Sequence, residues 1–354
     1  MSEMKAAVVY GQNDLRVMQV PVPDVISGSI RIKVEACAIC GTDKRIYKMG
    51  DFRASYPVIT GHEIAGTVES IDPGVTTFKV GDRVCVAPGH GCGLCETCKS
   101  GYPNVCTNPH PSLGYKLNGG FAEYMAVPEH ILRLGFVNKI PENLSFIQAS
   151  MSEIIACCIN AQNNAGVKTG DTVLVMGAGP AGIIHSHLAK LRGAKKVILT
   201  QRSRFRLDKA AALFPDVVDD IIPSTEEDLF ARVAELTSGK GADVVFVCAP
   251  SREAQEQALE LAAPRGRVNF FGGLPKDDRH VSLDSNNLHY KELFVSGASS
   301  SQPSGNIEAL ELLSKRIIDP DKLITNIYSL SDIDAGFSVM ESRDCIKVVI
   351  DMNL

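Results

Sequence analysis

The chain has 354 residues, an apolar fraction of 45% and a formal net charge of −5. This apolar fraction is typical of a folded globular protein, and the length favours two domains. The acidic balance argues against a general nucleic-acid binder, which usually presents a basic face. No apolar run is close to the length of a membrane span, which is about eighteen residues. The N-terminus lacks the apolar core of a secretion signal. We therefore expect a cytoplasmic protein with no nucleic-acid or membrane partner.

Short strands broken by glycine and proline fill the first 150 residues, as in VPVPDVISGSIRIKVEA and FKVGDRVCVAP. This pattern favours a β-rich domain. Two fragments within it, ACAICGTD at 36–43 and ITGHEIAGTV at 59–68, each place a metal-ligand side chain beside a carboxylate. Cys40 offers a thiolate and His62 an imidazole. A buried cysteine is most often only part of the core, so the pair needs a further ligand to make a site.

Three acidic residues could complete a metal site with this pair. Asp43 and Glu63 follow the cysteine and the histidine and could support the ligands from behind, and Glu63 is also an occasional ligand. Glu153, in ASMSEIIACC, is the candidate for the third ligand, although nothing in its immediate surroundings distinguishes it from other acids. Three protein ligands and one exchangeable position are typical of catalytic zinc.

Four of the eleven cysteines lie within residues 89–106, in GHGCGLCETCKSGYPNVC. Cys92, Cys95, Cys98 and Cys106 have the spacing C-x2-C-x2-C-x7-C, which lets four thiolates converge on one ion. Four sulfur ligands leave no open position, so this spacing predicts a structural zinc site. The alternative is a redox-active or disulfide loop, which is less common where thiols stay reduced.

A dinucleotide-binding motif lies in DTVLVMGAGPAGIIHSHLAKLRGAKKVILTQRSR, which begins at residue 171. A buried apolar strand, TVLVMG, runs into Gly177, Gly179, Pro180 and Gly182, and a helix and a second strand, KVILT, follow. In this strand-turn-helix frame the G-x-G-x-x-G pattern is specific. The glycines permit a tight turn, close approach of a pyrophosphate and packing of the helix on the strand. The phosphates are expected at the positive end of that helix.

The end of the second strand carries information about the cofactor. NAD-binding proteins usually place an Asp or Glu there to bind the ribose hydroxyls, but this chain has Gln201, Arg202 and Ser203, followed by Arg204 and Arg206. An acid would repel a 2′-phosphate, whereas an arginine pairs with one. We therefore expect NADP(H) to be preferred over NAD(H). The alternative is a solvated basic loop that tolerates either cofactor.

Strands and helices alternate downstream of this motif, which predicts a parallel sheet with helices on both faces. The predicted strands are 217–222, 243–248, 266–272 and 293–297, and the predicted helices are 226–238, 252–263 and 303–316. We place the nucleotide-binding domain at residues 155–290 and the β-rich domain at 1–154 and 291–354.

Together these motifs resemble the zinc-containing medium-chain dehydrogenase/reductase superfamily, the alcohol dehydrogenase family, and specifically its sorbitol-dehydrogenase-like polyol branch. The elements CGTD, GHE, the four-cysteine lobe, GDRV, GGFAEY and GAGPAG occur in the family's order along the whole chain. The resemblance implies an α/β fold with a Rossmann domain, a doubly wound parallel sheet, and a GroES-like catalytic domain that carries the structural zinc lobe. It also implies pairing of exposed edge strands, for which 293–297 is the candidate, into a homodimer or homotetramer.

The resemblance also implies roles for individual residues. Cys40 and His62 are expected to bind catalytic zinc, with Glu153 as third ligand, although Ile154 stands where the branch usually has proline. Thr42 corresponds to the hydroxyl residue that relays the substrate proton. Asp43 corresponds to the acid that supports the ligand histidine.

We therefore expect two zinc ions per chain and hydride transfer between NAD(P) and a secondary alcohol or ketone. The substrate is expected to be a polyol, a sugar alcohol or a polyol phosphate. Sorbitol itself is not expected to be the best substrate, because Arg45 replaces a common histidine and GASSSQP replaces an Arg-Tyr pair. Arg45 could face an anionic substrate or a cofactor phosphate, or be a surface charge. The alternatives are a zinc-independent quinone or enoyl reductase and a non-enzymatic NADPH-binding protein.

Overall fold

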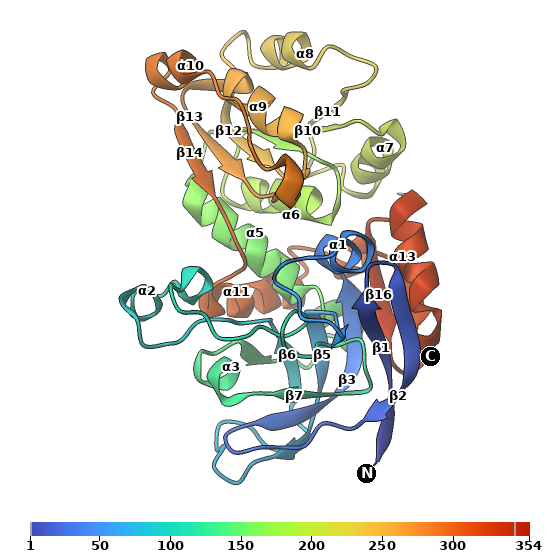
Figure 1. The fold of residues 1–354 in the computed structure, drawn as a ribbon. Coiled ribbons are helices and arrows are strands. Elements are labelled where there is room, and N and C mark those ends of the chain that lie inside the picture. Colours follow the sequence, from blue (N-terminus) through green and yellow to red (C-terminus); the bar gives the residue numbers. More distant parts are fainter. Residues whose placement is uncertain (1, 343–344) are drawn as a thin grey trace. The chain divides into compact units, whose positions relative to one another are not determined.

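The computed structural model describes residues 2–342 and 345–354 and consists of two compact units (Figure 1). One unit is formed by Met1–Ala156 with Ser301–Leu354, so that it contains both termini, and the other by Cys157–Ser300. The boundaries expected from the sequence assign residues 291–300 to the β-rich domain. In the structure the strand at Phe294–Gly297 is hydrogen-bonded into the parallel sheet of the second unit, which explains the later boundary.

The first unit is β-rich, as its broken strand pattern predicts. Its larger sheet has the order β15-β16-β3-β5-β6-β8, with β7 also paired to β3, and a smaller sheet has the order β2-β1-β4. The strands are β1 Glu3–Gly11, β2 Asp14–Pro21, β3 Ile30–Ile39, β4 Val58–Ile59, β5 Glu63–Ile71, β6 Arg83–Val86, β7 Tyr124–Val127, β8 Val137–Lys139, β15 Ile324–Ser329 and β16 Lys347–Asp351.

The helices described in the first unit have four to twelve residues. They are α1 Gly41–Met49, α2 Glu96–Lys99, α3 Glu129–Arg133, α4 Phe146–Ala149, α11 Pro303–Ser314, α12 Pro320–Leu323 and α13 Ile333–Ser342, with single 3-10 turns at Pro103–Val105 and Leu330–Asp332. Helix α5, Ser152–Ala165, runs from the first unit into the second. Among the described residues no helix combines the length and apolarity needed to cross a bilayer.

The core of the first unit lies around β3. Alternate residues of this strand are fully buried, among them Ile30, Ile32 and Val34, as expected for a sheet with one face on a core. Phe121 and Phe337, the latter from α13, pack edge to face with ring centroids 6.4 Å apart. The amino end of α1 and the start of β5 border this core, so the polar residues located there have a rigid base.

The second unit has the predicted parallel sheet, in the order β11-β10-β9-β12-β13-β14. Its elements are β9 Thr172–Met176, α6 Pro180–Leu191, β10 Lys196–Gln201, α7 Arg204–Leu213, β11 Asp220–Pro223, α8 Leu229–Leu236, β12 Ala242–Val247, α9 Arg252–Leu261, β13 Ala262–Phe270, a 3-10 turn Lys276–Asp278, α10 Ser285–Tyr290 and β14 Phe294–Gly297. Every residue of β9 is buried, which is typical of a strand covered on both faces.

The strand order reverses at β9, because β10 lies on one side of it and β12 on the other. In doubly wound sheets ligands bind beyond the carboxyl ends of the strands at this point. The glycine-rich turn begins directly after β9 and leads into α6. The structure thus confirms the predicted fold class and puts the turn where a dinucleotide is bound in such folds.

Candidate active site and metal centres

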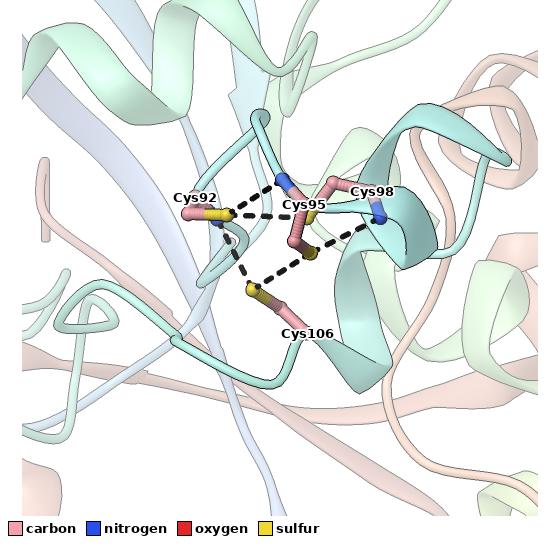
Figure 2. A group of neighbouring side chains, drawn as sticks. All are labelled: Cys92, Cys95, Cys98 and Cys106. Atoms are coloured by element: carbon pink, nitrogen blue, oxygen red, sulfur yellow. Dashed lines mark hydrogen bonds between the residues drawn. The ribbon is translucent and has the colours of Figure 1, made fainter.

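The four clustered cysteines surround a common point in a lobe that carries α2 (Figure 2). The Sγ atoms of Cys92 and Cys98 are 3.9 Å apart, and those of Cys95 and Cys106 are 3.7 Å apart. These separations are far beyond a disulfide bond, and none of the four cysteines is in a disulfide. Thiolates about 2.3 Å from a tetrahedral zinc ion lie about 3.8 Å from one another, so the lobe fits zinc.

Backbone amides of the lobe point at the sulfur atoms. The N–H groups of Leu94 and Cys95 donate to Cys92 Sγ and lower the pKa of that thiol. The N–H of Cys98 donates to Cys95 Sγ, which lowers the pKa of Cys95 to about 6. Loss of hydration instead raises the pKa of Cys98 to about 12. The loop therefore favours some thiolates by itself, and a divalent cation is needed to hold all of them in that form.

A second group of donor atoms lies at the border of the first unit's core. Ligand atoms of Cys40, His62 and Glu63 are within 4.8 Å of one another. Cys40 directly precedes α1, and the other two residues stand at the start of β5. They follow Gly61, whose φ of +90° disfavours other residues and whose added Cβ would lie 2.8 Å from Cys37 Sγ. This turn brings two neighbouring residues into one cluster.

Asp43 holds this cluster in place from its buried side. Its carboxylate accepts hydrogen bonds from the N–H groups of Cys40, at 2.8 Å, and Gly61, at 3.0 Å. The Oδ1 atom is also 3.2 Å from Nδ1 of His62, which leaves Nε2 of that ring free for a metal. Burial opposes ionisation, but His62 and these hydrogen bonds lower the pKa of Asp43. The expected contact between Asp43 and His62 is therefore present.

Glu63 has one satisfied and one orphaned carboxylate oxygen. Its Oε1 accepts a hydrogen bond of 2.6 Å from Nζ of Lys347, a residue of β16, and both side chains are buried. Burial disfavours the charged amine, but the carboxylate outweighs this and raises the pKa of Lys347. Oε2 is buried and has no hydrogen-bond partner among the described residues. An orphaned buried oxygen in a group with a thiol and an imidazole fits a metal ion.

The structure brings Glu63, rather than Glu153, into the close set of donor atoms. Glu153 is buried on the first turn of α5, and its charge is close enough to raise the pKa of Lys347. It therefore lies near the cluster without entering it. Thr42 is on the first turn of α1 and half-buried, and no hydrogen bond of its hydroxyl is found within the described chain.

The glycine-rich turn of the second unit has the packing expected for a dinucleotide site. Gly179 precedes α6 and Pro180 is its first residue. A Cβ on Gly182 would lie 1.7 Å from the carbonyl oxygen of Gly177, so only glycine lets the helix pack against the turn. A Cβ on Gly179 would lie 3.9 Å from Nη1 of Arg206, which places that guanidinium beside the turn.

A cavity of about 280 Å³ extends from this turn to the end of β10. Gln201 and Arg202 line it, together with Ser224 and Thr225 beyond β11 and Glu253 on α9. Ser203 precedes α7 and is not among the lining residues. We did not single out Ser224 and Thr225 from the sequence. The rule that ligands bind at the carboxyl ends of parallel strands would have pointed to them.

The arginines after β10 differ in their surroundings. Arg204 is paired with Asp208 and Glu226, so its charge is compensated. Arg202 lines the cavity and forms no ion pair with any described residue. It directly follows the last residue of β10. Glu253 also lines this cavity, but it belongs to α9. It therefore does not stand at the end of β10, where NAD-binding proteins usually have the acid that binds the ribose.

Comparisons with known proteins agree with this arrangement. The chain matches the family models described as "Alcohol dehydrogenase GroES-like domain", over residues 27–139, and "Zinc-binding dehydrogenase", over residues 180–315. It is 31% identical to sorbitol dehydrogenase from Bacillus subtilis, over 99% of this chain and 98% of the relative. It is 33% identical to D-arabitol-phosphate dehydrogenase from Enterococcus avium, over 97% of this chain and 95% of the relative.

A solved structure from Sinorhizobium meliloti, described as a zinc-binding dehydrogenase bound to NADP, is similar over the whole fold. Its TM-score is 0.89 at 30% identity, and the match covers 99% of this chain and 100% of that chain. The family models cover both units, and the sequence relatives are matched over nearly their full length. The chain thus belongs to the zinc-containing medium-chain dehydrogenase/reductase superfamily, in the polyol branch of the alcohol dehydrogenase family.

Proposed function

We propose that the chain is an NADP(H)-preferring, zinc-dependent dehydrogenase that interconverts a secondary alcohol and its ketone, with a polyol, sugar alcohol or polyol phosphate as substrate. The observation that carries this proposal is the cluster of Cys40, His62 and Glu63, with the orphaned Oε2 atom inside it. The polyol and polyol-phosphate dehydrogenases among the relatives support the substrate class. The zinc-independent reductase is less well supported, because it would need neither this cluster nor the cysteine lobe.

In this proposal the first unit is the catalytic domain with the structural zinc lobe, and the second unit binds the dinucleotide. The protein would hold two zinc ions, one in each group of donor atoms found in the described chain. The glycine-rich turn after β9 and the cavity at the end of β10 support a nucleotide in the second unit. Strand β14 lies at the edge of its sheet, and its residues Phe294 and Val295 are exposed, which supports pairing with a second copy of the chain. Native mass spectrometry would give the number of chains in the homo-oligomer.

The residues of the cluster have distinct tasks in the reaction. Zinc bound by Cys40, His62 and Glu63 would act as a Lewis acid and lower the pKa of the substrate hydroxyl. Asp43 fixes the ring of His62 so that Nε2 faces the ligand position. Lys347 balances the charge of Glu63. Glu153 would supply a further carboxylate next to this shell.

Oxidation of the alcohol requires that one proton and one hydride leave the substrate. The hydroxyl of Thr42 is not engaged with any described residue, so it can accept the substrate's hydroxyl proton and pass its own toward solvent. When bound, an oxidised nicotinamide would supply the acceptor for the hydride on the carbon that bears the hydroxyl, and the product would be a ketone. Ketone reduction is the reverse of these transfers.

The activity can be tested on the purified chain with a panel of polyols, polyol phosphates and ketones, each with NADP and NAD. We expect oxidation of at least one secondary alcohol, followed by the absorbance of the reduced cofactor. Treatment with a mild chelator should remove one zinc together with this activity, and added zinc should restore both. Reduction of quinones or enoyl substrates without any alcohol oxidation would instead indicate the zinc-independent class. Tight NADPH binding without turnover would indicate a non-enzymatic protein.

The cofactor preference is expected to depend on Arg202. Arg202→Asp should shift the ratio of kcat/KM for NADP over NAD toward NAD by about 100-fold or more, because it replaces a charge-assisted hydrogen bond with repulsion. Arg204→Gln is the matched control, since this arginine is already paired with two carboxylates, and should change the ratio only a few-fold. A wild-type preference for NAD, or an unchanged ratio in Arg202→Asp, would contradict the assignment.

A further inference from the structure

A second cationic residue, Arg53, lies beside the Cys40–His62–Glu63 cluster in the first unit. Its Nε and Nη2 atoms donate to the two carboxylate oxygens of Asp51, at 3.0 and 2.8 Å. Arg45 donates to the same carboxylate from α1, with its Nε 3.1 Å from Oδ2. Asp51 is almost fully buried, with 4% of its side chain exposed. One carboxylate therefore fixes two guanidinium groups, and one positive charge remains uncompensated.

The Tyr115 ring lies close to both Arg53 and His62. Its Cζ atom is 5.1 Å from the centroid of the Tyr115 ring, which is itself 5.5 Å from the centroid of the His62 ring. The N–H of Ser55 donates to the carbonyl oxygen of Tyr115, at 3.0 Å, and ties the two loops together. Asp51 is the main cause of the raised pKa of Arg53, and Tyr115 and Cys40 add to it. The guanidinium thus lies close to the Cys40 thiol of the donor cluster.

Both residues keep polar atoms available to a ligand. Nη1 of Arg53 and the hydroxyl of Tyr115 form no hydrogen bond with the residues that the structure describes. The side chain of Arg53 is 42% exposed, so its donor face is accessible. Arg45 is less exposed, at 28%, and its role is to hold Asp51 in place. The anionic group that the sequence suggested for Arg45 fits Arg53 better.

We propose that Arg53 and Tyr115 form an oxyanion subsite beside the metal cluster, which selects alcohols that carry a phosphate or carboxylate near the reacting hydroxyl. This proposal rests on the proposed dehydrogenase function and narrows its substrate class. An arginine held by a buried carboxylate is pre-oriented, so little side-chain entropy is lost when it binds an oxyanion. The tyrosine hydroxyl adds a second donor to the same group.

The test compares matched substrates in the full-length, metal-loaded protein. The pairs are arabitol with arabitol 5-phosphate, sorbitol with sorbitol 6-phosphate, and 2-butanol with 3-hydroxybutyrate. In the wild-type protein we expect the anionic member of at least one pair to have the higher kcat/KM. Arg53→Gln should lower that anionic-to-neutral ratio about 10- to 100-fold, mainly through KM. Arg53→Lys should retain part of the ratio, because it keeps the charge but loses the planar donor face.

Arg16→Gln is the matched control, because Arg16 forms the same two-pronged contact with Asp14 on the surface of β2. It should leave the ratio unchanged. The phosphate and hydroxy-acid pairs distinguish which oxyanion the subsite takes, and preference for either supports the proposal. A higher kcat/KM for the neutral member of every pair, or an Arg53→Gln variant with the wild-type ratio, overturns it.

A binding readout separates this proposal from the dehydrogenase function. Calorimetric titration of inorganic phosphate into protein saturated with NADP should show binding in the wild type that weakens about 10-fold or more in Arg53→Gln. If no alcohol is oxidised but phosphate binding still depends on Arg53, the proposed function fails and the subsite stands. If alcohols are oxidised and phosphate binding is equal in both proteins, the subsite fails and the proposed function stands.

Discussion

Replacing Cys40 with serine, or His62 with asparagine, is expected to reduce the zinc content from two ions per chain to one and turnover by about 1,000-fold or more. Each change removes one of the three donor side chains from a group whose donor atoms lie within 4.8 Å of one another. Lewis-acid assistance contributes several kcal/mol to such a reaction, and each 1.36 kcal/mol corresponds to about tenfold in rate. Elemental analysis and steady-state kinetics measure the two effects on one preparation.

Cys85→Ala is a suitable control for these variants. Cys85 is a buried cysteine of β6 whose sulfur contacts the carbonyl oxygen of Ala149 and belongs to neither group of donor atoms. This variant should keep both zinc ions, and its turnover rate should stay within a few-fold of the wild-type rate. Far-UV circular dichroism should be unchanged in all variants, since none of them alters the four cysteines proposed to bind the structural zinc. A Cys40→Ser protein that keeps two zinc ions and full turnover would refute the site.

The sequence predicts most reliably those sites whose residues are close together in the chain. The four lobe cysteines lie within one loop, so their spacing alone limits how they can converge, and the structure brings them together. The glycine-rich turn is equally local, because its strand, turn and helix are consecutive. The parallel order of the second unit's sheet also follows from the alternation of strands and helices, although the limits of β11 and β13 differ from the predicted ranges by several residues.

Contacts between distant residues explain what the sequence did not predict. Spacing gave no means of choosing between Glu63 and Glu153 as the third member of the cluster. The choice depends on the turn at Gly61, which orients Glu63, and on Lys347, which lies 284 positions away and binds only one of its oxygens. Arg53 was not singled out for the same reason, since its relation to the metal ligands runs through Tyr115 on another loop.

The buried pair of Glu63 and Lys347 gives the second large expected effect, on stability. Lys347→Met should lower the free energy of unfolding of the zinc-depleted protein by about 3–5 kcal/mol, because it leaves a buried carboxylate without its partner. The zinc-loaded protein should lose less, since a cation next to Glu63 compensates part of the same charge. Urea unfolding of the chelated and the zinc-loaded forms, followed by circular dichroism, measures both values.

The double variant Glu63→Gln with Lys347→Met distinguishes a charge effect from a packing effect. It removes both charges, so it should recover much of the stability that Lys347→Met loses in the zinc-depleted form. Lys139→Met is the matched control, because Lys139 pairs with Asp82 while its side chain is 58% exposed, and it should cost at most about 1 kcal/mol. If Lys347→Met lost equal stability with and without zinc, Glu63 would not be near the metal. Cys40 and His62 would then need Glu153 as the third metal ligand, since this carboxylate on α5 also acts on Lys347.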